Sequence, residues 1–174
     1  MVVYEYQNYF ENIARNYRKI LHNPEEDRKR FTTGNIEELL GGLKDDLNLS
    51  EPCLILYNFE GRFLENDGEA KRLLMQSAFA IVQDVEETDF EDMDKKSDEL
   101  FEIGSAIIGK MLHDRELHAA GKNCPSFIST FSLDSVKSTY VGRIGDSSYG
   151  WLFEFDIQNS ANELLTYREE EWNE

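Results

Sequence analysis

Residues 69–117 read EAKRLLMQSAFAIVQDVEETDFEDMDKKSDELFEIGSAIIGKMLHDREL, and this stretch decides the fold. It opens with a nearly continuous apolar run that ends in the acidic residues around Asp84. Such a run is typical of a strand covered on both faces, or of a central strand under a helix. The β-branched pair Ile81-Val82 favours a strand for the second half of the run. Periodicity alone does not exclude a helix over 69–78.

The second part of the same stretch predicts the longest helix of the chain. Its apolar and small residues recur at helical spacing and form one broad stripe: Met93, Leu100, Phe101, Gly104, Ile107, Ile108, Met111 and Leu112. Thr88 or Asp89 can cap its start, and Gly121 and Pro125 predict an end beyond Leu117. Glycine is unfavourable inside a helix. Gly104 therefore indicates close packing on a sheet, with a hinge as the alternative.

Two helices are expected before the strands. Residues 4–21 repeat aromatic and aliphatic side chains at three- and four-residue steps, until Asn23-Pro24 ends the pattern. The many tyrosines of this helix indicate either packing on the sheet or an oligomer contact, where tyrosine is enriched. Residues 25–33 are expected to be loop. A shorter helix is expected over 35–47, with Asn35 as its cap and Gly41-Gly42 weakening its middle.

The remaining segments predict strands. Residues 53–59 and 62–66 are expected to form a hairpin around Glu60-Gly61, followed by a strand over 73–84. Three strands are expected after the long helix, within 126–133, 136–144 and 149–157, the last with clear alternation. Gly145 to Ser148 predicts a turn, and a short tail that frays at its acidic end follows Ala161.

The pattern as a whole predicts an α+β fold. We expect a mostly antiparallel sheet with one long amphipathic helix packed on it, preceded by two N-terminal helices. The 174 residues predict one domain. Within it, residues 1–50 form an N-terminal helical sub-element, 51–158 an α+β core and 159–174 a C-terminal tail.

The charge of the chain argues against nucleic-acid binding. Thirty-five acidic and 18 basic residues give a net charge of −17, whereas binding to phosphates relies on clustered lysine and arginine. The N-terminus does not read as a secretory signal, and no apolar run approaches the roughly 18 residues that span a bilayer. We therefore expect a soluble, cytoplasmic protein that binds neither sequence-specific nucleic acid nor a membrane.

Three candidate chemical sites do not fit the patterns that their chemistry requires. His113 and His118 stand five apart, which places them on different faces of a helix and disfavours a zinc site with Cys124. Cys53 and Cys124 are expected to be free thiols. Gly145–Gly150 does not match the Gly-x-Ser-x-Gly nucleophile turn. The acids from Asp89 lack the glycine of a calcium loop. We expect no enzyme activity, no metal and no cofactor.

Two segments carry a resemblance to a known group. They are SAFAIVQDVEETDFEDMDKKSDELFEIGSAIIGKMLHDREL and DSSYGWLFEFDIQ. Over roughly 70–158 the chain resembles small phage structural proteins of the tail-completion or tail-terminator type, in the style of Bacteroidetes prophages. The resemblance implies an α+β subunit that forms a ring at the head-proximal end of a tail, without catalytic residues. The N-terminal helices and the 53–66 segment depart from that pattern.

The expected function is therefore that of a non-enzymatic structural or assembly protein. It would pair with protein partners or with copies of itself, and could be incorporated in a virion-like particle. Exposed aromatic side chains on the first helix and the last strand are the candidate contacts: Tyr6, Tyr9, Phe10, Tyr17, Tyr149 and Trp151. The alternative is a small acidic interaction or inhibitory module with an unknown protein partner.

Overall fold

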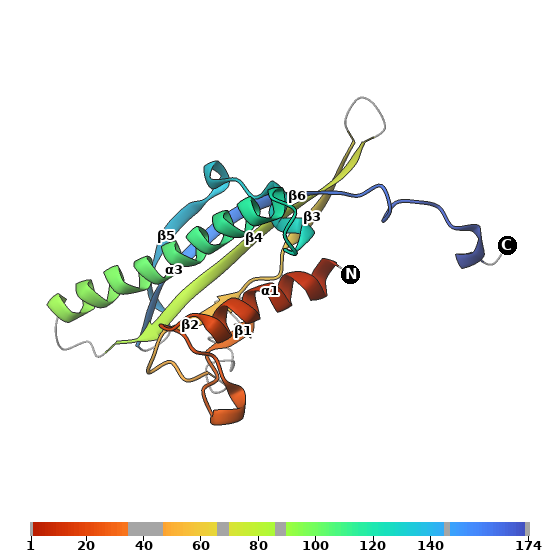
Figure 1. Cartoon of the computed structure of the whole chain (residues 1–174). Coiled ribbons are helices and arrows are strands. Elements are labelled where there is room, and N and C mark those ends of the chain that lie inside the picture. The colour runs from red at the N-terminus through yellow and green to blue at the C-terminus, as the bar shows by residue number, and fades with distance from the viewer. Residues whose placement is uncertain (1, 35–46, 66–69, 86–89, 145–146, 173–174) are drawn as a thin grey trace.

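The computed structural model describes residues 2–34, 47–65, 70–85, 90–144 and 147–172, and its architecture is α+β, as predicted. The helices α1 (Val2–Asn16) and α3 (Phe90–Ala119) pack on one face of a sheet (Figure 1). Six strands form that sheet: β1 (Phe31–Thr33), β2 (Cys53–Leu56), β3 (Glu60–Glu65), β4 (Lys71–Asp84), β5 (Lys137–Ile144) and β6 (Ser148–Ser160). Short 3-10 turns occupy 24–26, 126–130, 133–135 and 169–171.

The long ladder between β4 and β6 is the backbone of the sheet. It runs antiparallel from Arg72 opposite Ser160 to Asp84 opposite Ser148. The strand order is β1-β2-β4-β6-β5, and β3 pairs with β4. The sheet is mixed rather than simply antiparallel, because β1 runs parallel to β2. Residues 31–33, expected as loop, therefore form an edge strand.

The predicted hairpin of 53–59 with 62–66 is wrong. Both β2 and β3 run antiparallel to β4 along the same edge, β2 opposite residues 79–82 and β3 opposite residues 71–76. Tyr57, which follows β2 and precedes β3, donates its amide N–H to the Ala78 carbonyl of β4 at 2.9 Å. The chain thus continues along β4 instead of reversing at Glu60-Gly61. Within 69–78, where the sequence allows a helix or a strand, residues from Lys71 onward form strand β4.

The long helix and its packing glycine are as predicted. The stripe residues Leu100, Ile107 and Met111 are buried against the sheet. A β-carbon added at Gly104 would lie 2.0 Å from Cε2 of Phe153, so only glycine allows α3 to sit this close to β6. Phe153, Phe155 and Ile157 alternate along β6 and are buried on the same side.

Other expectations differ from the structure or fall outside the described residues. Helix α1 ends at Asn16 rather than Leu21, because the chain turns through Tyr17–Ile20 and Leu21 adopts a positive φ of 51°. The second expected helix, 35–47, falls mainly on residues outside the described ranges, as do the residues at the centre of the turn at 145–148. Residues 126–135 form two 3-10 turns, so two strands rather than three follow α3 in the described chain.

The core has two parts on opposite faces of the sheet. The larger part lies between the two helices and the sheet, and the aromatic residues Tyr6, Phe10, Phe79 and Phe155 are at its centre. The smaller part lies on the other face, around Cys53, Ile55, Ala80 and Val82, beneath Leu49. No described helix has the length and apolar character needed to cross a membrane.

Candidate interaction surfaces

Three of the predicted contact residues are core residues. Relative exposures are 1% for Tyr6, 8% for Tyr9 and 0% for Phe10. Their rings pack edge to face, with centroids 5.2 Å apart for Tyr6 and Phe10 and 5.4 Å apart for Tyr9 and Phe127. The aromatic excess of α1 therefore fixes this helix on the sheet. This corrects the expectation that these three side chains face a partner.

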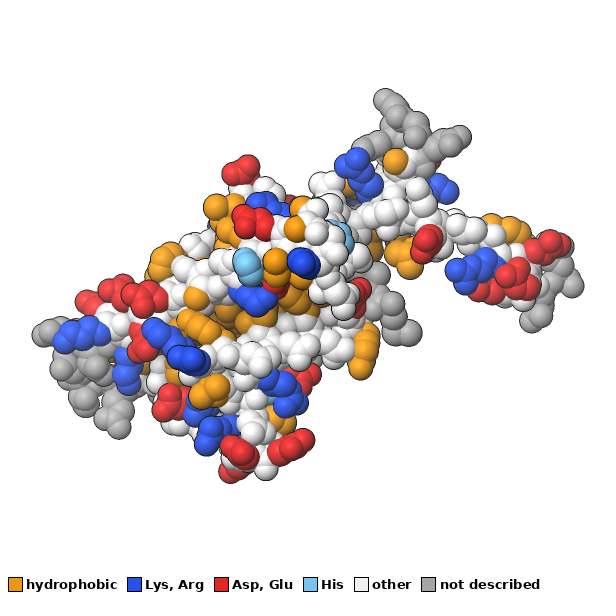
Figure 2. Space-filling model, in the orientation of Figure 1, with side chains coloured by type: hydrophobic (Ala, Val, Ile, Leu, Met, Phe, Trp, Pro, Cys, Tyr) orange, Lys and Arg blue, Asp and Glu red, His pale blue; other side chains and the backbone are white. Residues whose placement is uncertain are grey.

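Tyr17 lies instead at the end of an apolar groove between α1 and α3. The groove has a volume of about 660 Å³. It is lined by α1 and the turn after it on one side and by α3 on the other: Tyr9, Asn12, Ile13, Asn16, Tyr17, Ala106, Ile107, Lys110 and His113. Figure 2 shows hydrophobic side chains exposed in the strip between the two helices, with basic side chains beside it. The sequence signal for this groove is Ala106, a small residue at an exposed position of α3.

A polar network holds one wall of the groove. The Tyr9 hydroxyl donates to Oδ2 of Asp114 at 2.9 Å, and Nζ of Lys110 donates to the same oxygen at 2.6 Å. The Asp114 side chain is only 5% exposed, while Lys110 is 50% exposed. Burial raises the pKa of Tyr9, and the charge of Asp114 raises it further. The tyrosine therefore stays protonated and donates its hydrogen bond.

A second pocket, called here the basic pocket, lies beside the turn that follows α1. Its volume is about 360 Å³, and its lining includes four cationic residues, Arg18, Lys19, Arg28 and Arg30, beside the carboxylates of Glu51 and Glu99. Nζ of Lys19 lies 3.6 Å from Oε1 of Glu99 and 3.5 Å from Oε2 of Glu102. These two ion pairs connect the turn after α1 to α3. Arg28 also lies 3.7 Å from Glu26, so much of the positive charge of this pocket is already balanced within the chain.

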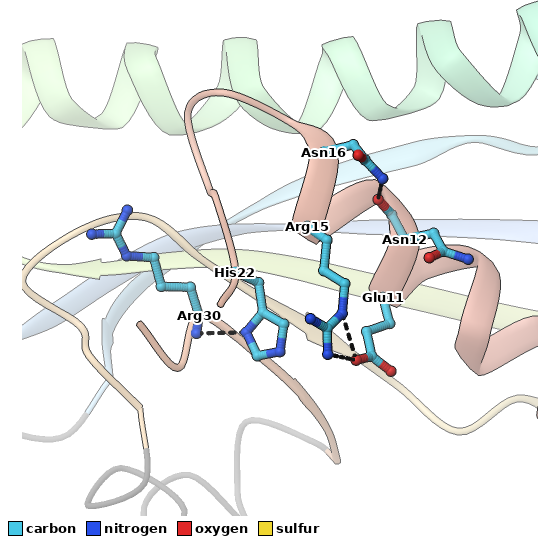
Figure 3. Close-up of polar contacts among 6 residues, drawn as sticks. All are labelled: Glu11, Asn12, Arg15, Asn16, His22 and Arg30. Carbon is cyan, nitrogen blue, oxygen red and sulfur yellow. Dashed lines mark hydrogen bonds and ion pairs between the residues drawn. The ribbon is translucent and has the colours of Figure 1, made fainter. Parts of the chain in front are cut away.

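Polar contacts hold the connection that follows α1 (Figure 3). The Arg30 amide donates to Nδ1 of the buried His22 at 3.0 Å, and the Arg30 guanidinium donates to the Ile20 carbonyl at 2.9 Å. Arg15 forms an ion pair with Glu11 on α1 at 2.7 Å. Burial lowers the pKa of His22, and the positive charge of Arg15 lowers it further. A neutral ring accepting a backbone hydrogen bond is a structural histidine.

Tyr149 and Trp151 lie away from the groove, near the start of β6. Trp151 is half-buried, and its ring centroid lies 4.8 Å from that of Phe101 and 5.5 Å from that of Tyr140. Its indole N–H donates to the Ser97 carbonyl at 3.0 Å. Phe101 is 38% exposed and Tyr140 46% exposed. The structure thus separates the six predicted residues into a core set, a groove residue and a patch beside β5.

The C-terminal segment, predicted to be a tail with a frayed acidic end, carries exposed apolar side chains. Ala161 is fully buried, but the following residues expose Leu164 by 57%, Tyr167 by 65% and Trp172 by 64%. Leu165 is 39% exposed. Figure 1 shows this segment leaving the body and running away from the two helices. The signal in the sequence was the density of large apolar residues in ELLTYREEEW.

The described residues hold no group of three or more His, Cys, Asp or Glu side chains placed to bind a metal ion. Cys53 and Cys124 are free thiols, as expected, and burial raises the pKa of Cys53 to about 12. Comparisons with protein-family models, with curated proteins and with solved structures find no significant match. Function is therefore inferred from the residues and surfaces described above.

Proposed function

We propose that this chain is a structural subunit that assembles with copies of itself, in the manner of a tail-completion ring subunit of a phage-like particle. The observation that carries the proposal is the arm formed by β3 and the first half of β4, which projects from the body (Figure 1). Every β3 residue is exposed except the half-buried Leu64, and Phe63 is 55% exposed. Leu73 and Met75 of β4 belong to the core, but β3 itself contributes no buried side chain, and a neighbouring subunit can cover its exposed face.

The opposite edge of the sheet gives a second contact of the same kind. β5 pairs with β6 on one side, and its residues Lys137 to Tyr140 are exposed. Unpaired edge strands offer backbone N–H and C=O groups to another chain. An arm at one end and an edge at the other suit a subunit that contacts two neighbours, which is the arrangement in a ring.

The test is the solution mass of the full chain, measured by light scattering from dilute to concentrated protein. The proposal predicts that the measured mass rises with protein concentration toward a fixed multiple of 20.3 kDa, or that closed rings are seen under the electron microscope. A mass of one chain at every concentration, with no ring, contradicts the proposal.

A second candidate is an acidic interaction or inhibitory module that acts as a monomer. The apolar groove between α1 and α3 favours it, because such grooves accept a helix or an extended peptide of another protein. A stable monomer would turn the choice toward this candidate.

A further inference from the structure

We infer that the outer edge of β3 pairs, as an antiparallel ladder, with the outer edge of β5 in a second copy of this chain. The inference rests on the proposed self-assembly and names the contact that produces it. Within the described residues, β3 pairs only with β4 and β5 pairs only with β6. Each of these two strands therefore has a side on which its backbone N–H and C=O groups can bond to an added strand.

The part of the sheet edge next to β5 is closed by the chain itself. There β6 extends past its ladder with β5, and hydroxyl groups take the place of a strand. The Ser135 hydroxyl accepts from the Asp156 amide at 3.2 Å. The Thr130 hydroxyl accepts from the Gln158 amide at 3.0 Å and donates to the Gln158 carbonyl. The exposed residues Lys137 to Tyr140 of β5 form the part of this edge that another strand can extend.

The directions of the strands suit this pairing. β3 is antiparallel to β4, β4 to β6 and β6 to β5, so β3 and β5 run in opposite directions at opposite sides of the sheet. When copies follow one another around a ring with their strands aligned, β3 of one copy meets β5 of the next as an antiparallel neighbour. β3 lies opposite residues 71–76 of β4, whereas β5 lies at the level of residues 78–82. The contact thus offsets successive copies along the strands, as the shear of a closed barrel does.

The lengths and charges of the two strands also match. β3 has six residues, EGRFLE, and the regular part of the β5 ladder runs from Lys137 to Val141. β5 contains no acidic residue, whereas β3 has a glutamate at each end. Antiparallel pairing brings Glu65, at the end of β3, toward Lys137, at the start of β5. Lys137 already lies 3.2 Å from Glu154, but its side chain is 73% exposed and can reach a second carboxylate.

Pairing of either strand with its own copy lacks this complementarity. Two antiparallel β3 strands would bring Glu60 of one copy toward Glu65 of the other, and like charges across a ladder are destabilising. Two β5 strands would offer each other no carboxylate. In a chain of net charge −17, the pairing of β3 with β5 is therefore the one that places acidic residues against an edge without acids.

Exposed aromatic side chains lie within both strands. Phe63 of β3 is 55% exposed, and Tyr140 of β5 is 46% exposed. Phe63 lies opposite Leu73 and Tyr140 opposite Trp151, so both belong to the face of the sheet on which the helices pack. Residues on the same face of paired strands contact each other. The proposed ladder thus lets these two rings cover each other across the contact.

The experiment compares the solution mass of the full chain with that of variants that each block one edge. Phe63→Glu places a carboxylate in β3, and Tyr140→Glu does the same in β5. Tyr4→Glu is the matched control, because it makes the same change at an aromatic residue that is 66% exposed on α1. We expect each edge variant to weaken association by roughly tenfold or more, while Tyr4→Glu associates like the original chain. Circular dichroism of dilute samples checks folding, and Phe63→Ser or Tyr140→Ser replaces an edge variant that does not fold.

Mixing the two edge variants identifies which edges meet. Phe63→Glu keeps an intact β5 edge and Tyr140→Glu keeps an intact β3 edge, so an equal mixture should form pairs of twice 20.3 kDa and stop there. Pairs formed by Phe63→Glu alone would show that β5 binds β5, and pairs formed by Tyr140→Glu alone would show that β3 binds β3. Either result overturns the inference, as does a mixture that does not pair.

The outcomes separate this inference from the proposed function. If the original chain assembles and both edge variants assemble equally well, the inference is overturned while self-assembly stands. If the original chain is a monomer at every concentration, the proposed function and the inference both fail.

Discussion

The two ends of the described chain are both rich in large apolar residues, yet they have opposite environments. In α1, Phe10 is 0% exposed and Tyr6 is 1% exposed, and both lie at the centre of the core. In the C-terminal segment, Tyr167 is 65% exposed and Trp172 is 64% exposed, and their rings stack on each other with centroids 6.1 Å apart. Aromatic content alone therefore does not identify an interaction surface.

Local structure explains the difference. Tyr6, Phe10 and Ile13 stand three and four residues apart on a helix, so one face of α1 carries them all to the sheet. The segment of Leu164, Leu165, Tyr167 and Trp172 is not a helix, since it forms a turn at 162–165 and a short 3-10 turn at 169–171. It therefore presents no continuous apolar face to the sheet, and these side chains stay exposed.

The largest effect is expected from breaking the buried end. Phe10→Ala removes a fully buried ring and should lower the free energy of unfolding by about 3–5 kcal/mol. Tyr4, on the same helix, is 66% exposed, so Tyr4→Ala should change it by less than about 0.5 kcal/mol. Denaturant titration of both variants measures the contrast. Equal losses would show that α1 is not held by its buried face.

The next effect tests how closely α3 lies on the sheet. Gly104→Ala places a methyl group 2.0 Å from Phe153, and we expect a loss of about 1–3 kcal/mol in unfolding free energy from overpacking. Gly109 lies on the same helix, with no atom within 4 Å of an added β-carbon. Gly109→Ala should therefore stabilise the protein, by up to about 1 kcal/mol. The melting temperatures of both variants measure this contrast. Stabilisation by Gly104→Ala would contradict the close packing of α3 on Phe153 of β6.

A smaller effect concerns the connection that follows α1. The pKa of His22 is lowered from its ordinary 6.5, so below that pH the unfolded chain binds a proton that the folded chain resists. The stabilisation is complete above about pH 6.5 and is lost as the pH falls below it. His22→Asn keeps an acceptor for the Arg30 amide but cannot titrate. The unfolding free energies of the original chain and of His22→Asn should diverge below about pH 6.5. Parallel pH profiles would refute the interpretation of His22 as a neutral ring in the folded chain.

The smallest effect on stability is expected at the exposed end. Tyr167→Ser should leave the unfolding free energy of the dilute protein within about 0.5 kcal/mol, because the side chain is 65% exposed. A calorimetric comparison of dilute samples checks this expectation. A large loss of stability would mean that the segment packs on its own chain.

The sequence predicted those elements whose residues interact locally or repeat regularly. The α3 stripe, the role of Gly104 and the alternation in β6 all follow from periods of 3.6 and 2. The pairing of β2 and β3 could not be predicted in the same way. Glu60-Gly61 has the composition of a turn, but the long β4 offers partners to both segments along one edge, and that is a property of the assembled sheet.

The candidate surfaces were harder to predict than the fold. Tyr17 was identified and does line the groove, whereas Tyr6 and Phe10 were misjudged because a tyrosine-rich stripe suits a core as well as an interface. The groove depends on how two helices distant in sequence lie together. The basic pocket likewise joins Arg18, Arg28 and Arg30 to Glu99 of α3, so only the folded chain brings it together.

Amide hydrogen exchange on the full chain, at low and at high protein concentration, tests the central claim most directly. The claim is that the α1 aromatics belong to the core while the outer edges of β3 and β5 pair with a second copy. It predicts slow exchange in residues 3–16 at both concentrations, and exchange in residues 60–65 and 137–141 that slows markedly at the high concentration. Unchanged exchange in residues 60–65 and 137–141, or protection of α1 that arises only on concentration, would contradict it.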